Sequence, residues 1–268
     1  MKAMSVSAPT LVASGVSPQA PRIRRILLAA EGTGTARAAD LVATLAAGLA
    51  AEAILVETAR PLRAEEILER SRDALADLIV IASSPGSGYG LLESLLAGAG
   101  CPVLIVPDTP EARGLGRILC PTDFSHPASA ALAWSRRLAC AFASHLTLLH
   151  VLEWFPEEAS HGTTSVSEHH VDLAAELRAR VRSGLVGADW VGLESELLVA
   201  SGRPHVEILR TAREDGSCLI ALGAHGLRRT DRLLPGSTVY HVALESLCPV
   251  LVVGPRAEEP HAAKGAEP

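Results

Sequence analysis

The residues best suited to chemistry in this chain are glycines and small hydroxyl residues, spaced to hold a phosphate. Gly223-Ala224-His225-Gly226 is followed, after nine residues, by Gly236-Ser237-Thr238, and the apolar run Leu219–Leu222 leads into the first glycine. Glycine lets backbone N–H groups approach a ligand where a Cβ would obstruct them. Ser237 and Thr238 stand where a helix is expected to begin, with unpaired N–H donors and a positive dipole end. The spacing therefore predicts a phosphate site that needs no P-loop lysine.

This pattern resembles the nucleotide-binding motif of the universal stress protein family. The glycine spacing is G-x2-G-x9-G-S, and Cys248-Pro249-Val250-Leu251-Val252-Val253 closes the unit, as in that family. A similar Pro-Thr-Asp ends the family's first strand, and its Asp, here Asp123, meets the adenosine part of the nucleotide. The strand Leu146 to Leu152 ends at His150-Val151, which matches the family position whose backbone reads adenine. The resemblance covers about residues 115 to 254.

The resemblance implies a bound adenine nucleotide, ATP in the first instance, alone or with Mg²⁺. The residues that it implies as the binding site are Pro121, Thr122, Asp123, Val151, Leu222, Gly223, His225, Gly226, Arg228, Arg229, Gly236, Ser237 and Thr238.

Several of these residues have a simpler alternative role. Asp123 contacts the nucleotide, or else Asp123 or Ser125 caps the following helix. Arg228 and Arg229 either pair with phosphate oxygens or are solvated loop residues. His225 is either a spacer whose backbone binds or a titratable base.

No residue set in the sequence supports a reaction. No Lys follows the glycines, no Ser/His/Asp order is evident, and no carboxylates are paired near the expected site. Phosphoryl transfer needs a cation clamp and a positioned nucleophile, and only the clamp is present. We therefore assign no catalytic residue and expect a regulatory module that binds ATP and signals through its assembly surface. Two alternatives are a slow ATPase or autophosphorylating enzyme, and a nucleotide-free dimerisation scaffold.

The composition of the chain limits the fold classes, partners and locations that remain possible. The chain has 268 residues, 48% of them hydrophobic but only 3% aromatic, which is typical of a parallel sheet with an Ala, Leu and Val core. A net charge of −6 without blocks of like charge argues against a nucleic-acid partner. No apolar run approaches the roughly 18 residues of a membrane span, and no signal peptide is evident. The five cysteines form no C-x2-C pair, and His169-His170 completes no ligand spacing, so neither zinc nor a disulfide framework is expected. We expect a cytoplasmic protein.

An internal repeat organises the chain. Cys101-Pro102-Val103-Leu104-Ile105-Val106 repeats the closing Cys248–Val253 run, and Arg25-Ile26-Leu27 repeats Arg117-Ile118-Leu119. Arg60-Pro61 pairs with Arg203-Pro204 at an offset of 143 residues, whereas Arg25-Ile26-Leu27 and Arg117-Ile118-Leu119 are only 92 residues apart. The first copy is therefore shorter between these two points, and we infer that it lacks the second strand and the helix after it. Its glycine loop is also shortened: Ala82 replaces the first motif glycine and Ala30-Glu31 replaces Thr-Asp. The first copy is interpreted as a degenerate half that does not bind.

The expected fold is α/β, with two tandem doubly wound parallel sheets. The second sheet is expected to have five strands in the order 3-2-1-4-5, and the first to have four. The expected division is a disordered tail at 1–22, a degenerate domain at 23–108, a linker at 109–115, a nucleotide-binding domain at 116–255 and a disordered tail at 256–268. The apolar edge strands Val103–Val106 and Val250–Val253 each need a partner. We favour their pairing within one chain, with pairing between two chains as the alternative.

Overall fold

A computed structural model of the chain describes residues 4–7, 23–31, 35–58, 63–83, 89–109, 114–153, 193–224, 236–254 and 256–257. The strands are β1 Met4–Ser7, β2 Arg25–Glu31, β3 Glu52–Thr58, β4 Leu78–Ser83, β5 Val103–Pro107, β6 Arg117–Pro121, β7 His145–Glu153, β8 Ser195–Gly202, β9 Leu219–Gly223 and β10 Val250–Val253. The helices are α1 Thr35–Leu49, α2 Ala64–Asp73, α3 Tyr89–Gly98, α4 His126–Phe142, α6 Pro204–Asp215 and α7 Ser237–Glu245.

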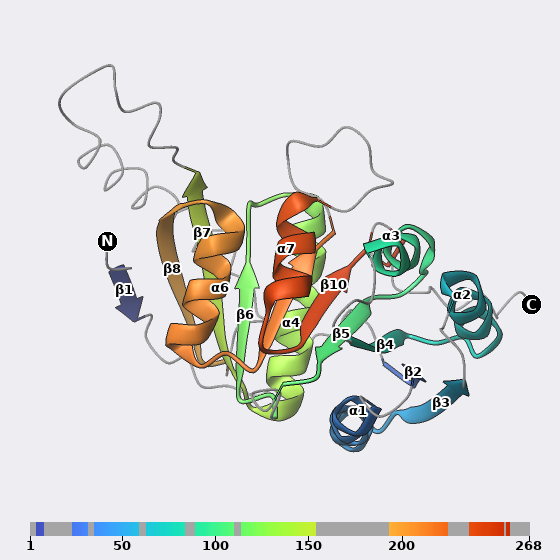
Figure 1. Cartoon of the computed structure of the whole chain (residues 1–268). Coiled ribbons are helices and arrows are strands. Elements are labelled where there is room, and N and C mark those ends of the chain that lie inside the picture. The colour runs from blue at the N-terminus through green and yellow to red at the C-terminus, as the bar shows by residue number, and fades with distance from the viewer. Residues whose placement is uncertain are drawn as a thin grey trace, which may run out of the picture.

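All of these strands belong to one sheet, in the order β1-β8-β7-β6-β9-β10-β5-β4-β2-β3 (Figure 1). The run from β8 to β10 is parallel throughout and, counted in chain order within residues 116–255, reads 3-2-1-4-5. The run β5-β4-β2-β3 is also parallel and contains four strands. The expectation of an α/β fold built on mostly parallel strands is confirmed.

The two expected parallel sheets are joined into one, because β5 and β10 pair with each other. These two strands pair antiparallel, with Val250 opposite Ile105, Leu251 opposite Leu104 and Val252 opposite Val103. Each strand is the last of its half and would otherwise present unpaired backbone groups and apolar side chains at an edge. Pairing within the chain removes both edges at once, which is the arrangement favoured from the sequence.

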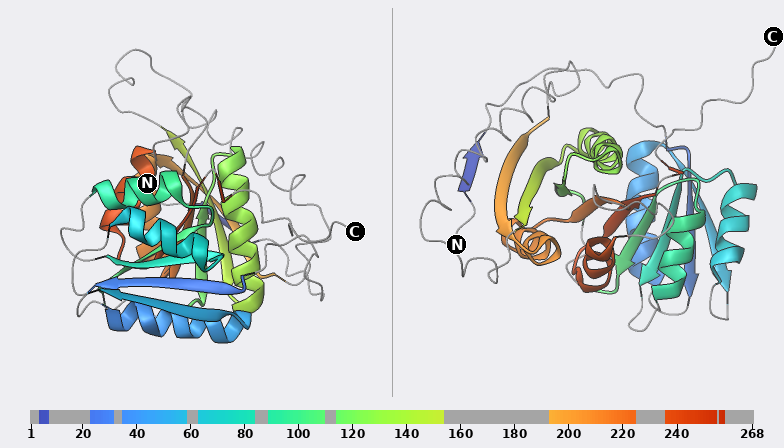
Figure 2. Two further views of the ribbon diagram at one scale, coloured as in Figure 1. Left: turned by 90° about the vertical axis from the view of Figure 1, so that its right-hand side faces the viewer. Right: turned by 90° about the horizontal axis from the view of Figure 1, so that it is seen from above.

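Helices cover both faces of the sheet. Side chains of α1 and α4, such as Leu45 and Trp134, pack on one face, and side chains of α2, α3, α6 and α7, such as Leu95 and Ile208, pack on the other. The right-hand view of Figure 2 shows this three-layer arrangement, with the strands between the two sets of helices. The alternation of apolar side chains to both faces explains why the strands read as continuous apolar runs.

The expectation that residues 1–22 form only a disordered tail is wrong for residues 4–7. Strand β1 pairs antiparallel with β8, from Met4 opposite Val199 to Ser7 opposite Glu196. This pairing satisfies backbone groups along the outer edge of β8. Without β1, a strand of another chain could pair with that edge. Because β1 joins β8 and not β3, the first half keeps four strands.

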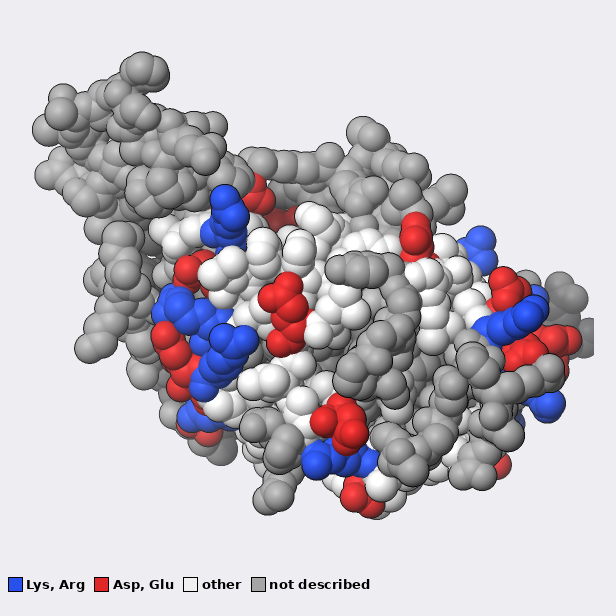
Figure 3. Space-filling view, viewed as in Figure 1, with Lys and Arg blue, Asp and Glu red and all other residues white. Residues whose placement is uncertain are grey.

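On the face seen in Figure 3, charged side chains of both signs gather at the left and right sides and in a smaller group at the lower centre. On α6, Arg210 pairs with Glu207 at 2.6 Å and with Glu214 at 2.7 Å.

None of the helices in the parts of the chain that the structure describes is both long enough and apolar enough to cross a membrane.

Candidate nucleotide site

The turn after β6 is held by its own side chains. The Thr122 Oγ1 atom accepts from the Phe124 N–H at 3.1 Å, and Asp123 Oδ1 accepts from the Ser125 N–H at 3.0 Å. These contacts support Phe124 in the left-handed region, with φ +63°, which a bulky residue rarely adopts. Ser125 is the N-cap of α4, because its side chain accepts from the Ala128 N–H. The capping role is therefore filled by Ser125, and Asp123 shapes the turn before it.

His150 ties the same turn to β7. Its Nδ1 atom lies 2.7 Å from the Thr122 carbonyl oxygen, and its ring packs against Phe124 with centroids 4.9 Å apart. A carbonyl oxygen only accepts, so Nδ1 carries the proton and the neutral ring is the Nδ1–H tautomer. The Thr122 N–H also donates to the Leu149 carbonyl at 2.8 Å. Sequence reasoning named only the backbone here and missed the His150 side chain, whose partner depends on the register of two strands.

Val151 and Leu222 contribute little side chain to this edge. Val151 packs against the core beneath α6 and α7 and pairs with Ala200 of β8. Leu222 is buried in the same core. The Leu222 side chain is thus turned into the core, and the Val151 side chain is partly buried against it.

Gly223 ends β9 where α4 begins. A Cβ on Gly223 would lie 2.5 Å from the carbonyl carbon of Pro127 and 2.8 Å from the nitrogen of Ala128. No other residue fits between this strand end and the first turn of α4. The Ala224 N–H then donates to the Val253 carbonyl at 2.9 Å, so the loop leaves β9 from a fixed point.

Gly236 differs from Gly223 because nothing in the described protein requires a glycine there. Its φ of −68° suits any residue, and the nearest atom to an added Cβ is the Ala224 carbonyl oxygen at 3.9 Å. Gly236 is the N-cap of α7, and no side chain caps this helix. The first backbone N–H groups of α7, beginning with Ser237 and Thr238, therefore lack a side-chain acceptor from the cap position.

These pieces meet at one edge of the sheet. β6 pairs in parallel with β9, Ile118 opposite Leu219, so the turn bearing Asp123 and the end of β9 lie side by side (upper edge in Figure 1). The chain leaves β6 toward β7 on one side and returns in β9 on the other. Such a reversal of strand order is where open α/β sheets bind ligands. His225, Gly226, Arg228 and Arg229 lie outside the described residues.

The corresponding edge of the first half is built differently. Five residues join β4 to α3, whereas thirteen join β9 to α7. Ala82 lies within β4, beside Val106 of β5, at the position where the second half has Gly223. Among the described residues of either half, no group of three or more His, Cys, Asp and Glu side chains is placed to hold a metal ion.

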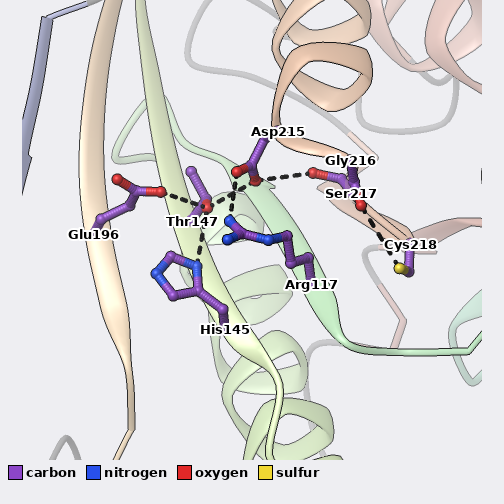
Figure 4. Close-up of polar contacts among 8 residues, drawn as sticks. All are labelled: Arg117, His145, Thr147, Glu196, Asp215, Gly216, Ser217 and Cys218. Atoms are coloured by element: carbon purple, nitrogen blue, oxygen red, sulfur yellow. Dashed lines mark hydrogen bonds and ion pairs between the residues drawn. The ribbon is translucent and has the colours of Figure 1, made fainter.

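A polar cluster occupies the opposite edge of the second half, where its strands begin (Figure 4). Asp215, at the end of α6, accepts from Arg117 Nη1 at 2.6 Å and from the Thr147 hydroxyl at 3.1 Å. The Thr147 hydroxyl is fully buried and also lies 3.3 Å from Glu196 Oε1. The cluster joins β6, β7, β8 and α6, and it holds the strand starts in register at the edge away from the nucleotide motif.

Comparison with known proteins gives the family. Residues 114–254, more than half of the chain, match the model of the Universal stress protein family. The chain belongs to the universal stress protein family. Within the family, universal stress protein YxiE of Bacillus subtilis is 32% identical over 147 residues, covering 51% of this chain and 97% of the relative. Universal stress protein MJ0577 of Methanocaldococcus jannaschii is 28% identical over 151 residues, covering 51% of this chain and 93% of the relative.

A solved structure extends the likeness of fold beyond the matched half. The crystal structure of a universal stress protein from Archaeoglobus fulgidus is 22% identical, with a TM-score of 0.53, and covers 82% of this chain and 77% of its own. This likeness concerns the fold alone, and it includes strands of both halves.

Proposed function

We propose that this universal stress protein is a regulatory module that binds ATP, or another adenine nucleotide, at the carboxyl ends of β6 and β9. The observation that carries the proposal is the start of α7. There the N-terminus of α7 has no side-chain cap, and among the described residues a Cβ at Gly236 would meet only the Ala224 carbonyl oxygen, at 3.9 Å, at the reversal of strand order. Backbone N–H groups and the helix dipole favour an anion at this place.

The contrast between the two motif glycines supports a ligand at Gly236. Gly223 is required by the packing of α4 on β9, whereas Gly236 has no packing or backbone reason to be glycine. A phosphate that approaches the backbone closely supplies such a reason. The phosphate groups would meet Gly226, Gly236, Ser237 and Thr238, with Arg228 and Arg229 offsetting their charge.

The adenosine part would lie against the tips of β6 and β7. Pro121 ends β6 and Thr122 follows it. The Asp123 carboxylate would accept from the ribose hydroxyls, and the backbone at Val151 would meet the base. Mg²⁺ would bind only together with the nucleotide, through its phosphate groups.

The same proposal includes the division of labour between the halves. Residues 116–255 would bind the nucleotide, and residues 23–108 would be a shortened copy that has lost its site and supplies the partner strand β5. Occupancy of the site would alter the surface of the joined sheet and so signal nucleotide state. All five cysteines are free in the structure, which supports a reducing, cytoplasmic setting.

Mass spectrometry of the purified chain tests this function directly. Under native conditions we expect a mass increase equal to one adenine nucleotide, and under denaturing conditions the mass of the unmodified chain. A persistent phosphate after denaturation would instead indicate autophosphorylation. No increase under native conditions, even with added ATP, would contradict nucleotide binding.

Substitution of Gly236 tests the site. We expect Gly236→Val to abolish ATP binding in calorimetry, because its side chain would occupy the approach path of the phosphate. The matched control is Gly90→Val at the start of α3, where an added Cβ meets nothing within 4 Å and so, as at Gly236, no close contact. Unchanged ATP affinity in Gly236→Val would show that the phosphate does not bind at α7.

A further inference from the structure

Two cysteines lie side by side where β9 and β10 begin. Val250 stands opposite Ile220 in this parallel pair, and the Ile220 N–H donates to the Pro249 carbonyl at 2.9 Å. Extended two residues back, just beyond the starts of both strands, this register sets Cys218 beside Cys248, and the effect of Cys218 on the pKa of Cys248 agrees with this placement. Neighbouring parallel strands are about 4.8 Å apart. A disulfide needs a Cα separation of about 4.4–6.8 Å, so the backbone spacing suits one.

The two thiols are also close enough to influence each other. Burial raises the pKa of the Cys248 thiol, the Ser246 hydroxyl opposes the rise, and the charge of Cys218 adds to it. Ser246 also fixes the position of Cys248, because its Oγ accepts from the Cys248 N–H at 3.2 Å and lies 3.5 Å from the sulfur. Cys218 is held in turn by its N–H, which donates to the Arg117 carbonyl at 2.9 Å.

The two cysteines differ in their access to solvent. Cys248 is buried, whereas Cys218 is partly exposed at the strand start seen in Figure 4. The Cys218 sulfur makes a weak contact, 3.7 Å from the Gly216 carbonyl oxygen. An oxidant can therefore reach Cys218 first, with Cys248 beside it to resolve the product.

The first half repeats this geometry with one thiol replaced. Its Cys101-Pro102 stands beside Asp77, since the Ile79 N–H donates to the Pro102 carbonyl at 3.0 Å, as Ile220 does to Pro249. Burial raises the pKa of the Cys101 thiol most, and the charge of Asp77 raises it further, which shows that Asp77 lies close to Cys101. The Asp77 carboxylate accepts from the backbone N–H groups of Arg24 and Arg25. The second half thus has a thiol where the first has a carboxylate.

We propose that Cys218 and Cys248 are a redox-active pair that forms a reversible disulfide when the protein meets a hydroperoxide. The Cys218 thiolate attacks one peroxide oxygen, the O–O bond breaks, and Cys218 sulfenic acid and water form after proton uptake. The Cys248 thiolate then attacks the Cys218 sulfur, the S–O bond breaks, and the departing hydroxide takes up a proton. Two thiols lose two electrons in total, and hydrogen peroxide is reduced to two waters. The site lies at the edge of the sheet away from the nucleotide motif, so it is independent of the proposed function.

Peptide mapping of the full-length chain tests the proposal. After treatment with hydrogen peroxide, alkylation of free thiols and non-reducing digestion, we expect one peptide pair that links Cys218 to Cys248 and disappears on reduction. Cys101→Ser and Cys140→Ser should leave this crosslink unchanged. Cys218→Asp, which copies the arrangement of the first half, should abolish it. A peroxide-treated chain whose Cys218 and Cys248 are both alkylated, or which crosslinks only between chains through the exposed Cys140, would overturn the proposal.

Two further measurements separate the steps. In Cys248→Ser we expect a sulfenic acid at Cys218 that dimedone traps, whereas Cys101 and Cys120, whose pKa values burial raises to about 12, should not react. Because the pKa of Cys248 is raised, crosslinking should accelerate as the pH rises from neutral to 9. A rate that does not rise with pH would contradict attack by the Cys248 thiolate.

Discussion

At the scale of single residues, the two motif glycines differ in the physical reason for which each position is glycine. The backbone of Pro127 and Ala128 closes on Gly223, whereas a Cβ on Gly236 would meet only the Ala224 carbonyl oxygen, at 3.9 Å, among the described residues. The spacing of glycines in the sequence identifies both positions but cannot distinguish a glycine required by packing from one required by a ligand. That distinction depends on where α4 begins relative to β9, which is a property of the folded chain.

We expect Gly223→Ala to destabilise the protein by about 1–3 kcal/mol, since forcing an atom into packed backbone displaces α4 from β9. Urea denaturation measures the change in the free energy of unfolding. Gly116→Ala is the control, because an added Cβ there meets nothing within 4 Å, and it should change stability by no more than about 0.5 kcal/mol. Equal stability of Gly223→Ala and the wild type would refute the close approach of α4.

Asp123 is expected to act through its charge as well as its shape. Asp123→Asn keeps an oxygen that can accept from the Ser125 N–H, so the turn and the melting temperature should be preserved. Loss of a charged hydrogen bond costs about 1.5–3 kcal/mol, and we therefore expect ATP affinity to fall at least roughly tenfold in calorimetry. Asp123→Ala should lower both affinity and stability. Wild-type affinity in Asp123→Asn would show that the carboxylate does not touch the nucleotide.

At the scale of elements, much of the second half follows from its sequence, because its strands are mainly apolar and Ser125, Pro204 and Gly236 mark where its helices begin. The changing offsets between repeated pairs predicted a missing second strand in the first half. β3 accordingly pairs directly with β2, where the second half has β7 beside β6. The pairing of β1 with β8 had no such signal. Four residues without a strong pattern become a strand because the edge of β8 offers them partners, and this is a tertiary effect.

The contact between α6 and α7 should make stability depend on pH. His205 of α6 stacks on His241 of α7 with ring centroids 4.4 Å apart, and His241 Nδ1 lies 2.9 Å from Glu245 Oε1. Desolvation lowers the pKa of His205, as do His241 and Arg203, whereas Glu245 raises it.

Because the folded pKa of His205 lies below the unfolded value, the unfolded chain binds more protons between the two values, and stability falls as the pH drops through that window. We expect the melting temperature to decrease between neutral pH and pH 5, and His205→Asn to flatten part of this decrease. NMR titration of the His205 ring measures the pKa directly. An identical pH slope in the variant would exclude His205 as a contributor.

At the scale of the whole molecule, the antiparallel pair β5–β10 decides the assembly. The sequence could identify two apolar edge strands that needed partners, but it could not decide between one chain and two. That choice depends on whether the linker lets β5 reach β10, and residues 108 to 116 separate β5 from β6 in the sequence. In the folded chain Leu104 and Leu251, both almost fully buried, stand opposite each other at the centre of the junction.

We therefore expect the wild-type protein to sediment as a single chain of 28.0 kDa at micromolar concentration, since both central edges are already satisfied. Leu104→Lys places a charge in the apolar junction and should cost several kcal/mol, because the ammonium loses its hydration without gaining a partner. Once opened, the β5 and β10 edges become available to other chains, so this variant should form larger species whose proportion rises with concentration. Glu69→Lys, at an exposed position of α2, is the control and should sediment like the wild type. A wild-type species near twice the chain mass would show that an outer edge of the sheet, at β1 or β3, also pairs between chains.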